Sequence, residues 1–183
     1  MMEYRIAVLV GSLRKASFNL QLAHALAKLL PAHFKPTYAN LDLPLYNQDL
    51  DLSMPAGAVA LKDLVRQSQG VLFVTPEHNR SIPAALKNAI DWGSRPPGQN
   101  VWTGKPGGIV GISPSNAGTA MAQQHLRNIL AAEGSMSLTL PEVFLQMKDG
   151  FFDADGAIAN ADTRAFLQGW VDRYVAWVEK LAA

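Results

Sequence analysis

Short apolar runs alternate along the chain with longer segments in which apolar residues recur at helical spacing. Residues 6–10, 71–74 and 107–112 are almost continuously apolar, which is typical of strands buried on both faces of a sheet. Periodicity near 3.6 residues, bounded by proline or glycine, predicts five helices. These helices cover residues 20–30, 55–69, 83–92, 117–132 and 163–181.

A weaker strand is predicted over residues 35–41 and a fifth strand over residues 135–140, whereas residues 143–156 are predicted to be irregular. Strands that alternate with helices indicate an α/β fold with a parallel sheet covered on both faces. Five strands and five helices fit a flavodoxin-like three-layer sandwich with strand order 2-1-3-4-5. Residues 1–183 are expected to form a single domain of this kind, with its ligand beyond the carboxyl ends of the strands.

The composition of the chain excludes several classes of protein function. The 183 residues are 49% apolar and 17% charged, with a net charge of +1, so the sequence predicts a globular chain without the basic surface of a nucleic-acid-binding protein. The chain contains no cysteine, which excludes thiolate nucleophiles and cysteine-ligated metals. The N-terminal residues lack the pattern of a signal peptide, and no apolar run approaches the ~20 residues of a membrane span. We therefore expect a cytoplasmic protein without membrane contact.

The loop after the first strand is rich in hydrogen-bond donors. Gly11 ends the strand, and Ser12, Arg14, Ser17 and Asn19 follow just before the first helical pattern. A helix N-terminus with hydroxyl groups and an arginine is suited to a phosphate. The loop matches neither a Walker A motif nor a dinucleotide fingerprint, which points to a phosphomonoester such as a mononucleotide. The alternative is an ordinary turn with a serine cap.

A second polar loop, Pro76, Glu77, His78 and Asn79, follows the strand at residues 71–74. Backbone amides of such a loop can contact the edge of a flat heteroaromatic ring, and nearby donors can stabilise charge that the ring gains on reduction. Glu77 alone could equally cap the helix that begins at Pro83, and His78 alone is more typical of a surface histidine. No metal site is expected, because the loop lacks further ligands at suitable spacing.

A third loop follows the strand at residues 107–112 and contains Ser113, Ser115 and Gly118. Its small, hydroxyl-rich residues leave room for a planar ligand to approach the backbone. A helix start capped by Ser115 or Asn116 is an equally good interpretation of this segment taken alone.

Together, the segments GSLRKASFN, LPLYNQDL, TPEHNRSIPAALKNAIDWGSRP and AQQHLRNIL resemble the NADPH-dependent FMN reductase family. The resemblance is strongest to its quinone and chromate reductase branch and to related azoreductases, and it extends to about Pro141. It implies FMN as cofactor and NADPH or NADH as co-substrate. The sequence departs from the family pattern at two places. His78 stands where the family usually has tyrosine, and the third loop is less rich in glycine.

The resemblance also assigns cofactor-binding positions to residues of this chain. The phosphate would lie at Ser12, Arg14, Ser17 and Asn19, with Phe18 in the same loop. The isoalloxazine ring would lie against residues 76–79, and residues 113–118 would contact the flavin from the third loop.

The implied reaction is ping-pong hydride transfer through bound FMN to a small-molecule acceptor: a quinone, an azo compound, a free flavin or chromate. No catalytic side chain is expected, because the flavin carries the chemistry. The resemblance further implies a homodimer or homotetramer, to which Leu86, Ile90, Trp92 and Trp102 could contribute anchors, although Trp92 taken alone is more typical of a core residue. The alternatives are a flavodoxin-like electron carrier and an FMN-binding module without NAD(P)H turnover. Carriers tend to be strongly acidic, which the net charge of +1 does not match.

Overall fold

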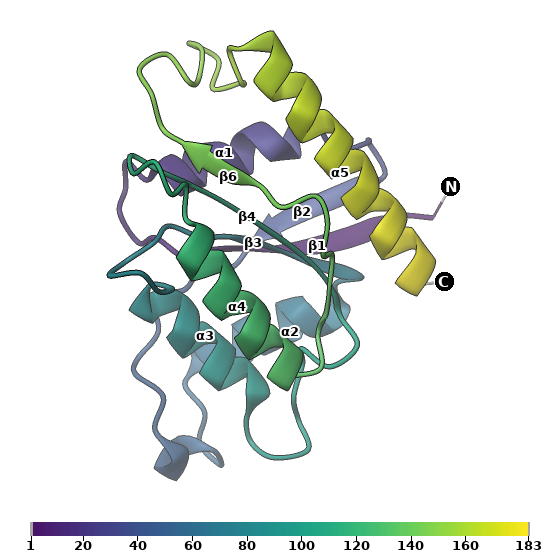
Figure 1. Cartoon of the computed structure of the whole chain (residues 1–183). Helices are drawn as coiled ribbons and strands as arrows, with labels where there is room; N and C mark the ends of the chain where they lie inside the picture. The colour runs from purple at the N-terminus through teal and green to yellow at the C-terminus, as the bar shows by residue number, and fades with distance from the viewer. Residues whose placement is uncertain (1, 183) are drawn as a thin grey trace.

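The computed structural model describes residues 2–182 and consists of a parallel sheet between two layers of helices (Figure 1). The strands are β1 (Tyr4–Val10), β2 (Phe34–Tyr38), β3 (Gly70–Val74), β4 (Pro106–Ser113), β5 (Met136–Ser137) and β6 (Phe144–Gln146). The helices are α1 (Phe18–Ala27), α2 (Ala56–Gln67), α3 (Ala84–Ser94), α4 (Ala120–Ala132) and α5 (Ala161–Ala182), with a short 3₁₀ helix η1 (Gln48–Leu50). The sheet order β2-β1-β3-β4-β5 confirms the predicted flavodoxin-like fold.

The two faces of the sheet have separate apolar cores, because successive strand residues point to opposite sides. Ile6, Val8 and Val10 of β1 pack with α1 and α5, whereas Ala7 and Leu9 pack with α2, α3 and α4. Figure 1 shows α1 and α5 on one side of the sheet and the other three helices on the opposite side. The central strands are thus buried on both faces, as their continuous apolar runs predict.

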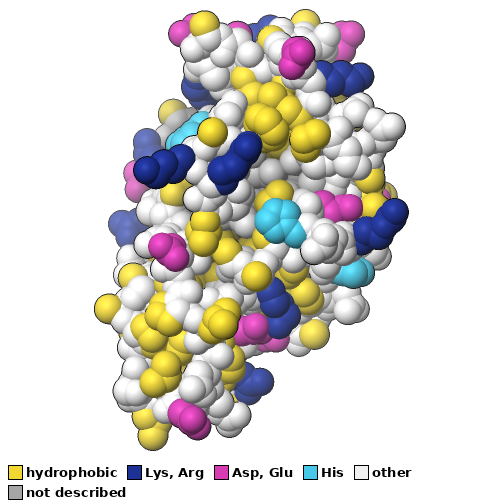
Figure 2. Space-filling model, turned by 90° about the vertical axis from the view of Figure 1, so that its left-hand side faces the viewer, with side chains coloured by type: hydrophobic (Ala, Val, Ile, Leu, Met, Phe, Trp, Pro, Cys, Tyr) yellow, Lys and Arg dark blue, Asp and Glu magenta, His cyan; other side chains and the backbone are white. Residues whose placement is uncertain are grey.

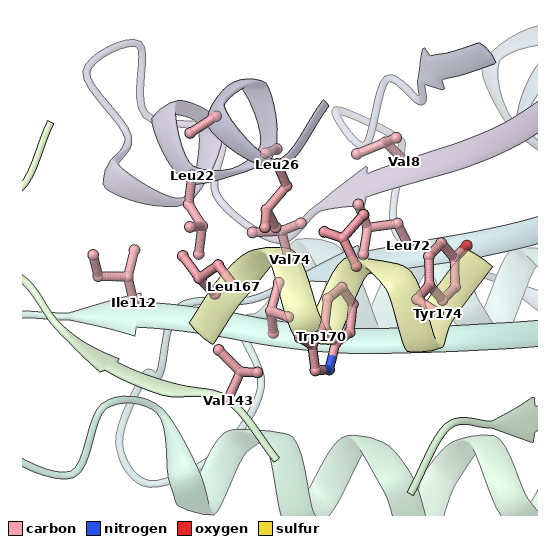
Figure 3. Close-up of a cluster of buried hydrophobic side chains, with 14 of the residues drawn as sticks. Val8, Leu22, Leu26, Leu72, Val74, Ile112, Val143, Leu167, Trp170 and Tyr174 are labelled. Carbon is pink, nitrogen blue, oxygen red and sulfur yellow. The ribbon is translucent and has the colours of Figure 1, made fainter. Parts of the chain in front are cut away.

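The C-terminal helix packs closely against the middle of the sheet. Trp170 and Tyr174 of α5 belong to the same core as Leu22 and Leu26 of α1, which Figure 3 shows. The two aromatic rings are stacked, with centroids 5.6 Å apart. A Cβ at Gly108 would lie 2.7 Å from Tyr174 Cδ2, so glycine at this position of β4 allows the ring to approach the sheet.

Tyr174 also offers a test of the packing. Its hydroxyl oxygen is buried and has no hydrogen-bond partner among the described residues, and burial raises the pKa of this phenol. Because an unpaired buried polar group is unfavourable, Tyr174→Phe is expected to stabilise the protein by ~1 kcal/mol while keeping the stacked ring. Thermal unfolding should then show a midpoint about 2–4 °C higher. An unchanged or lower midpoint would mean that the hydroxyl group has a partner in solution.

The fifth strand differs from the prediction over residues 135–140. Only Met136–Ser137 pair with the start of β4, and the chain rejoins β4 at residues 144–146, within the segment predicted to be irregular. The edge strand is thus divided into β5 and β6 by an excursion that contains Pro141. Proline has no N–H group to donate to the ladder, so the strand cannot pair continuously through this excursion.

The helix predicted over residues 117–132 begins later, at Ala120. Ser115 Oγ accepts a hydrogen bond from Ala117 N–H, and Gly118 and Thr119 have positive φ values of 55° and 74°. These conformations are incompatible with a right-handed helix. The segment therefore forms a turn, and α4 starts after it.

The apolar residues that were considered as interface anchors lie inside the protein. Leu86, Ile90, Trp92 and Trp102 are all buried in the core on the α2–α3–α4 side of the sheet. The indole N–H of Trp92 donates to Pro44 O, and that of Trp102 donates to Ile90 O. Core packing, the alternative role of Trp92, is thus confirmed, and none of the four side chains is exposed for contact with a second subunit.

Candidate functional site

A cavity of about 570 Å³ opens at the carboxyl ends of β1, β3 and β4, a volume typical of ligand sites. Figure 2 looks onto this edge of the molecule, where histidine and Lys/Arg side chains lie among apolar ones. The cavity is lined by Gly11, Ser12, Leu13, Arg14, Ser17, Phe18, Asn19, Pro76, Glu77, His78, Pro83, Ala84, Ala85, Ile112, Ser113 and Pro114. The cavity brings together most of the predicted cofactor-binding residues, but Asn79, Ser115 and Gly118 are not in its lining.

The first loop ends in a helix start that is open to an anion. Ser17 is the N-cap of α1, and its Oγ accepts a hydrogen bond of 3.2 Å from Leu20 N–H. The hydroxyl proton of Ser17 stays available, because the cap uses the oxygen only as an acceptor. The first turn of α1 contains no acidic residue, so the positive end of the helix is not neutralised from within.

Arg14 lies over the first turn of α1. Its guanidinium carbon is 4.8 Å from the centroid of the Phe18 ring, and the group donates to Ala16 O. Stacking and hydrogen bonding hold the cation at the cavity while several of its N–H groups stay free. The predicted roles of Arg14 and Phe18 are thus joined: the ring supports the cation.

The side chain of Asn19, which was predicted to bind a phosphate, is hydrogen-bonded to the backbone of Ile112. Its side-chain Nδ2 donates to Ile112 O at 2.9 Å, and its Oδ1 accepts from Ile112 N–H at 3.1 Å. Strand β3 has ended at this level, since its last link to β4 is Thr75 N–H to Val110 O. The buried amide of Asn19 therefore continues the ladder in place of β3. Both polar atoms of the side chain thus have a partner on Ile112, and the second Nδ2 N–H and the backbone N–H of Asn19 take no part in these two bonds.

The second loop forms a compact turn beside the cavity. His78 and Ser81 exchange two backbone hydrogen bonds, and the residues between them, Asn79 and Arg80, have φ values of 50° and 63°. Two successive positive φ values define a type I′ turn. Asn79 lies at its exposed tip, which explains its absence from the cavity lining.

Glu77 acts as a helix cap, but for α4 rather than for the helix that follows Pro83. Its Oε2 accepts a hydrogen bond of 3.1 Å from Ala122 N–H in the first turn of α4. The predicted capping role was thus right about the chemistry and wrong about the helix. The carboxylate is also part of the cavity lining.

Gly11 and the small residues at the start of α3 allow the two loops to meet. A Cβ at Gly11 would lie 2.9 Å from Pro83 Cγ and 3.2 Å from Pro76 Cδ, so a larger residue would displace the second loop. Ala84 and Ala85 also line the cavity, although neither was predicted as a site residue. The sequence feature that could have indicated them is the pair of small side chains directly after Pro83.

The third loop contributes through Ser113 and Pro114 alone. Ser115 Oγ is occupied in the local turn with Ala117. Gly118 packs behind the loop, where an added Cβ would lie 2.7 Å from the Phe144 carbonyl carbon. These two residues shape the loop without lining the cavity.

Two further features concern residues 2–182 as a whole. No helix in this part of the chain is long and apolar enough to cross a bilayer. Within the same residues, His, Asp and Glu side chains form no group of three or more that could hold a metal ion.

The fold and this site define the class of flavodoxin-like α/β proteins with a ligand cavity at the switch point of the sheet. The family model described as NADPH-dependent FMN reductase matches residues 4–150, and the chain belongs to this family. The protein is an NAD(P)H-dependent oxidoreductase with FMN as cofactor, as the sequence predicted.

Individual relatives extend over nearly the whole chain. The chain is 49% identical over 178 residues to a 2-hydroxy-1,4-benzoquinone reductase from a Burkholderia species, which covers 97% of each protein. It is 43% identical over 178 residues to a quinone reductase from Pseudomonas putida, covering 96% of this chain and 95% of the relative. The structure of FerB, a flavoenzyme NAD(P)H:(acceptor) oxidoreductase from Paracoccus denitrificans, superposes with a TM-score of 0.93. It is 44% identical and covers 97% of this chain and 98% of its own.

Proposed function

We propose that the cavity holds FMN with its phosphate at the start of α1. The observation that carries this proposal is the helix N-terminus itself, which has no acidic residue in its first turn and has Ser17 as its cap. Backbone N–H groups and the hydroxyl groups of Ser12 and Ser17 would donate to the phosphate, and Arg14 would supply its charge partner. In this arrangement the whole chain acts as one FMN-binding domain.

The ring would lie at the other end of the cavity. Pro76 and Glu77 would contact one side of it, and Ser113 would lie at another edge. The exposed side chain of His78 would border the opening through which other molecules reach the ring. When bound, FMN supplies the hydride chemistry, while the protein positions the reactants and sets the local electrostatics.

NAD(P)H and the acceptor would use the same open space in turn, which gives ping-pong kinetics. Quinones are the proposed acceptors, supported by the names of two relatives that cover the chain almost completely. Azo compounds, free flavins and chromate are further candidates, since an open flavin site discriminates little among acceptors. A cytoplasmic location, where NAD(P)H is supplied, completes this proposal.

The direct test is steady-state turnover of the FMN-loaded protein with NADPH or NADH and a panel of acceptors: several quinones, an azo dye, free FMN and chromate. We expect parallel double-reciprocal lines and the highest kcat/KM with a quinone. Failure of any quinone to support FMN-dependent oxidation of NADPH or NADH would contradict the proposed function.

The same preparation distinguishes an enzyme from an electron carrier. On rapid mixing with NADPH under anaerobic conditions, the bound flavin should be bleached directly, without a separate reductase. A flavin that is reduced only after a reductase is added would instead support a carrier.

We also propose a homodimer or homotetramer, supported by apolar side chains that one chain leaves exposed. Leu45, Leu52 and Val59 have exposed fractions of 80%, 99% and 41%. They belong to the loop around η1 and to the adjoining α2. Figure 2 shows apolar side chains gathered at the lower end of the molecule, where the η1 segment lies in Figure 1. Large exposed apolar groups of this kind mark interfaces. Light scattering of the wild type and of Leu52→Asp should show loss of the oligomer in the variant.

A further inference from the structure

Glu77 lies between the cavity and the first turn of α4. Its carboxylate is part of the cavity lining, and its Oε2 accepts the Ala122 N–H. Helix α4 lacks a cap of its own: the N-cap residue Thr119 makes no side-chain cap hydrogen bond, and the first turn contains no acidic residue. The carboxylate that complements the positive end of α4 is therefore supplied by the second loop.

A second contact links the same loop to the same helix. Ser81 Oγ lies 3.0 Å from Nδ1 of His125, one turn further along α4. The type I′ turn is thus attached to α4 at both of its ends, through Glu77 and through Ser81. The position of the loop against a ligand depends on these two contacts, because its tip is exposed.

Glu77 forms no ion pair within the described part of the chain, where the ion pairs join other residues. The partial positive charge of the α4 N-terminus is its only identified counterpart there. A carboxylate at this place adds negative potential to the ring end of the cavity. Hydride transfer adds negative charge to a flavin, and a nearby carboxylate opposes that step.

We propose that Glu77 is a positioning residue with two roles: it anchors the second loop to α4, and its charge lowers the reduction potential of the bound flavin. A lower potential disfavours reduction by NAD(P)H but makes the reduced flavin a stronger donor to the acceptor. This inference rests on the proposed FMN site, because the cavity must hold the flavin ring near residue 77. The anchoring role concerns the protein alone.

Two substitutions separate the roles. Glu77→Gln keeps an oxygen that can accept from Ala122 N–H but removes the charge, whereas Glu77→Ala removes both. Glu3→Gln is a matched control, because Glu3 is exposed and precedes β1 at the opposite end of the sheet. The measurements are the thermal midpoint of each FMN-free protein and the midpoint potential of each FMN-loaded protein by spectroelectrochemistry.

We expect Glu77→Gln to shift the two-electron equilibrium about tenfold toward reduced flavin, ~30 mV in potential. Its FMN-free thermal midpoint should lie between those of the wild type and Glu77→Ala, because the hydrogen bond from Ala122 N–H is kept while the attraction between the carboxylate and the α4 N-terminus is lost. Glu77→Ala should show a similar potential shift and, through loss of the cap, a midpoint about 2–4 °C lower. Glu3→Gln should change neither quantity.

A wild-type potential in Glu77→Gln would overturn the electrostatic role, and a wild-type thermal midpoint in Glu77→Ala would overturn the anchoring role. Wild-type protein that binds no FMN would overturn the proposed function together with the electrostatic role. The FMN-free measurements would still decide the anchoring role in that case, so the two failures are distinguishable.

Discussion

Replacing Arg14 with alanine is expected to weaken FMN binding about 10- to 100-fold and to change riboflavin binding little. A hydrogen-bonded contact with a charged group contributes ~1.5–3 kcal/mol, and each 1.4 kcal/mol corresponds to about tenfold in affinity. Arg14 is the cation that lines the cavity next to the start of α1. Riboflavin lacks the phosphate, so its binding should not depend on this charge. Flavin-fluorescence titration of the FMN-free protein measures both affinities.

The conservative variant sharpens this test. Arg14→Lys keeps the charge but loses the planar group that stacks on Phe18 and donates several hydrogen bonds. It should bind FMN with an affinity between those of the wild type and Arg14→Ala. An equal loss of FMN and riboflavin affinity in Arg14→Ala would show that Arg14 supports the loop through Phe18 and does not bind the phosphate.

The central strands could be predicted from the sequence because their environment is simple. Residues of β1, β3 and β4 are buried on both faces, and a short continuous apolar run is typical of a strand in that position. The edge strand of the sheet was harder to predict. Strand β6 has only three residues, one of them exposed, and its pairing with β4 depends on where the excursion around Pro141 returns to the sheet. No local pattern specifies that point.

The loops of the site could also be predicted, since each directly follows a buried strand in a fold whose ligands lie at that edge. The roles of individual side chains were harder to predict. Glu77 and Ala122 are separated by 45 positions, and Asn19 and Ile112 by 93. Both residues line the cavity, but each side chain is also bonded to the backbone of a distant element, which no local pattern in the sequence indicates.

The turn at residues 78–81 shows another limit. A type I′ turn usually contains glycine or asparagine at its positive φ positions, and here arginine occupies the second of them. Arg80 thus obscured the tight turn that removes Asn79 from the cavity lining. Tertiary attachment of the turn to α4 through Glu77 and Ser81 provides a physical reason for this conformation.

Asn19→Leu is expected to destabilise the FMN-free protein by about 2–5 kcal/mol, a large part of the ~5–15 kcal/mol typical of a folded domain. Leucine has a similar size but cannot pair with Ile112, so the N–H and C=O groups of that residue would stay buried without partners. Each such group costs ~1–3 kcal/mol. Denaturant unfolding monitored by tryptophan fluorescence gives the free energy of unfolding.

Neighbouring variants distinguish the strand-like role of Asn19 from a phosphate-binding role. Ser17→Ala, two residues earlier in the same loop, removes only a helix cap and should cost ~1 kcal/mol. Asn19→Asp retains an acceptor for Ile112 N–H but sets its second oxygen against the Ile112 carbonyl group. Its destabilisation should shrink as the pH falls, because a protonated carboxyl group can donate to that carbonyl oxygen. If Asn19→Leu unfolded like the wild type and lost affinity for FMN but not for riboflavin, the side chain would be a phosphate ligand after all.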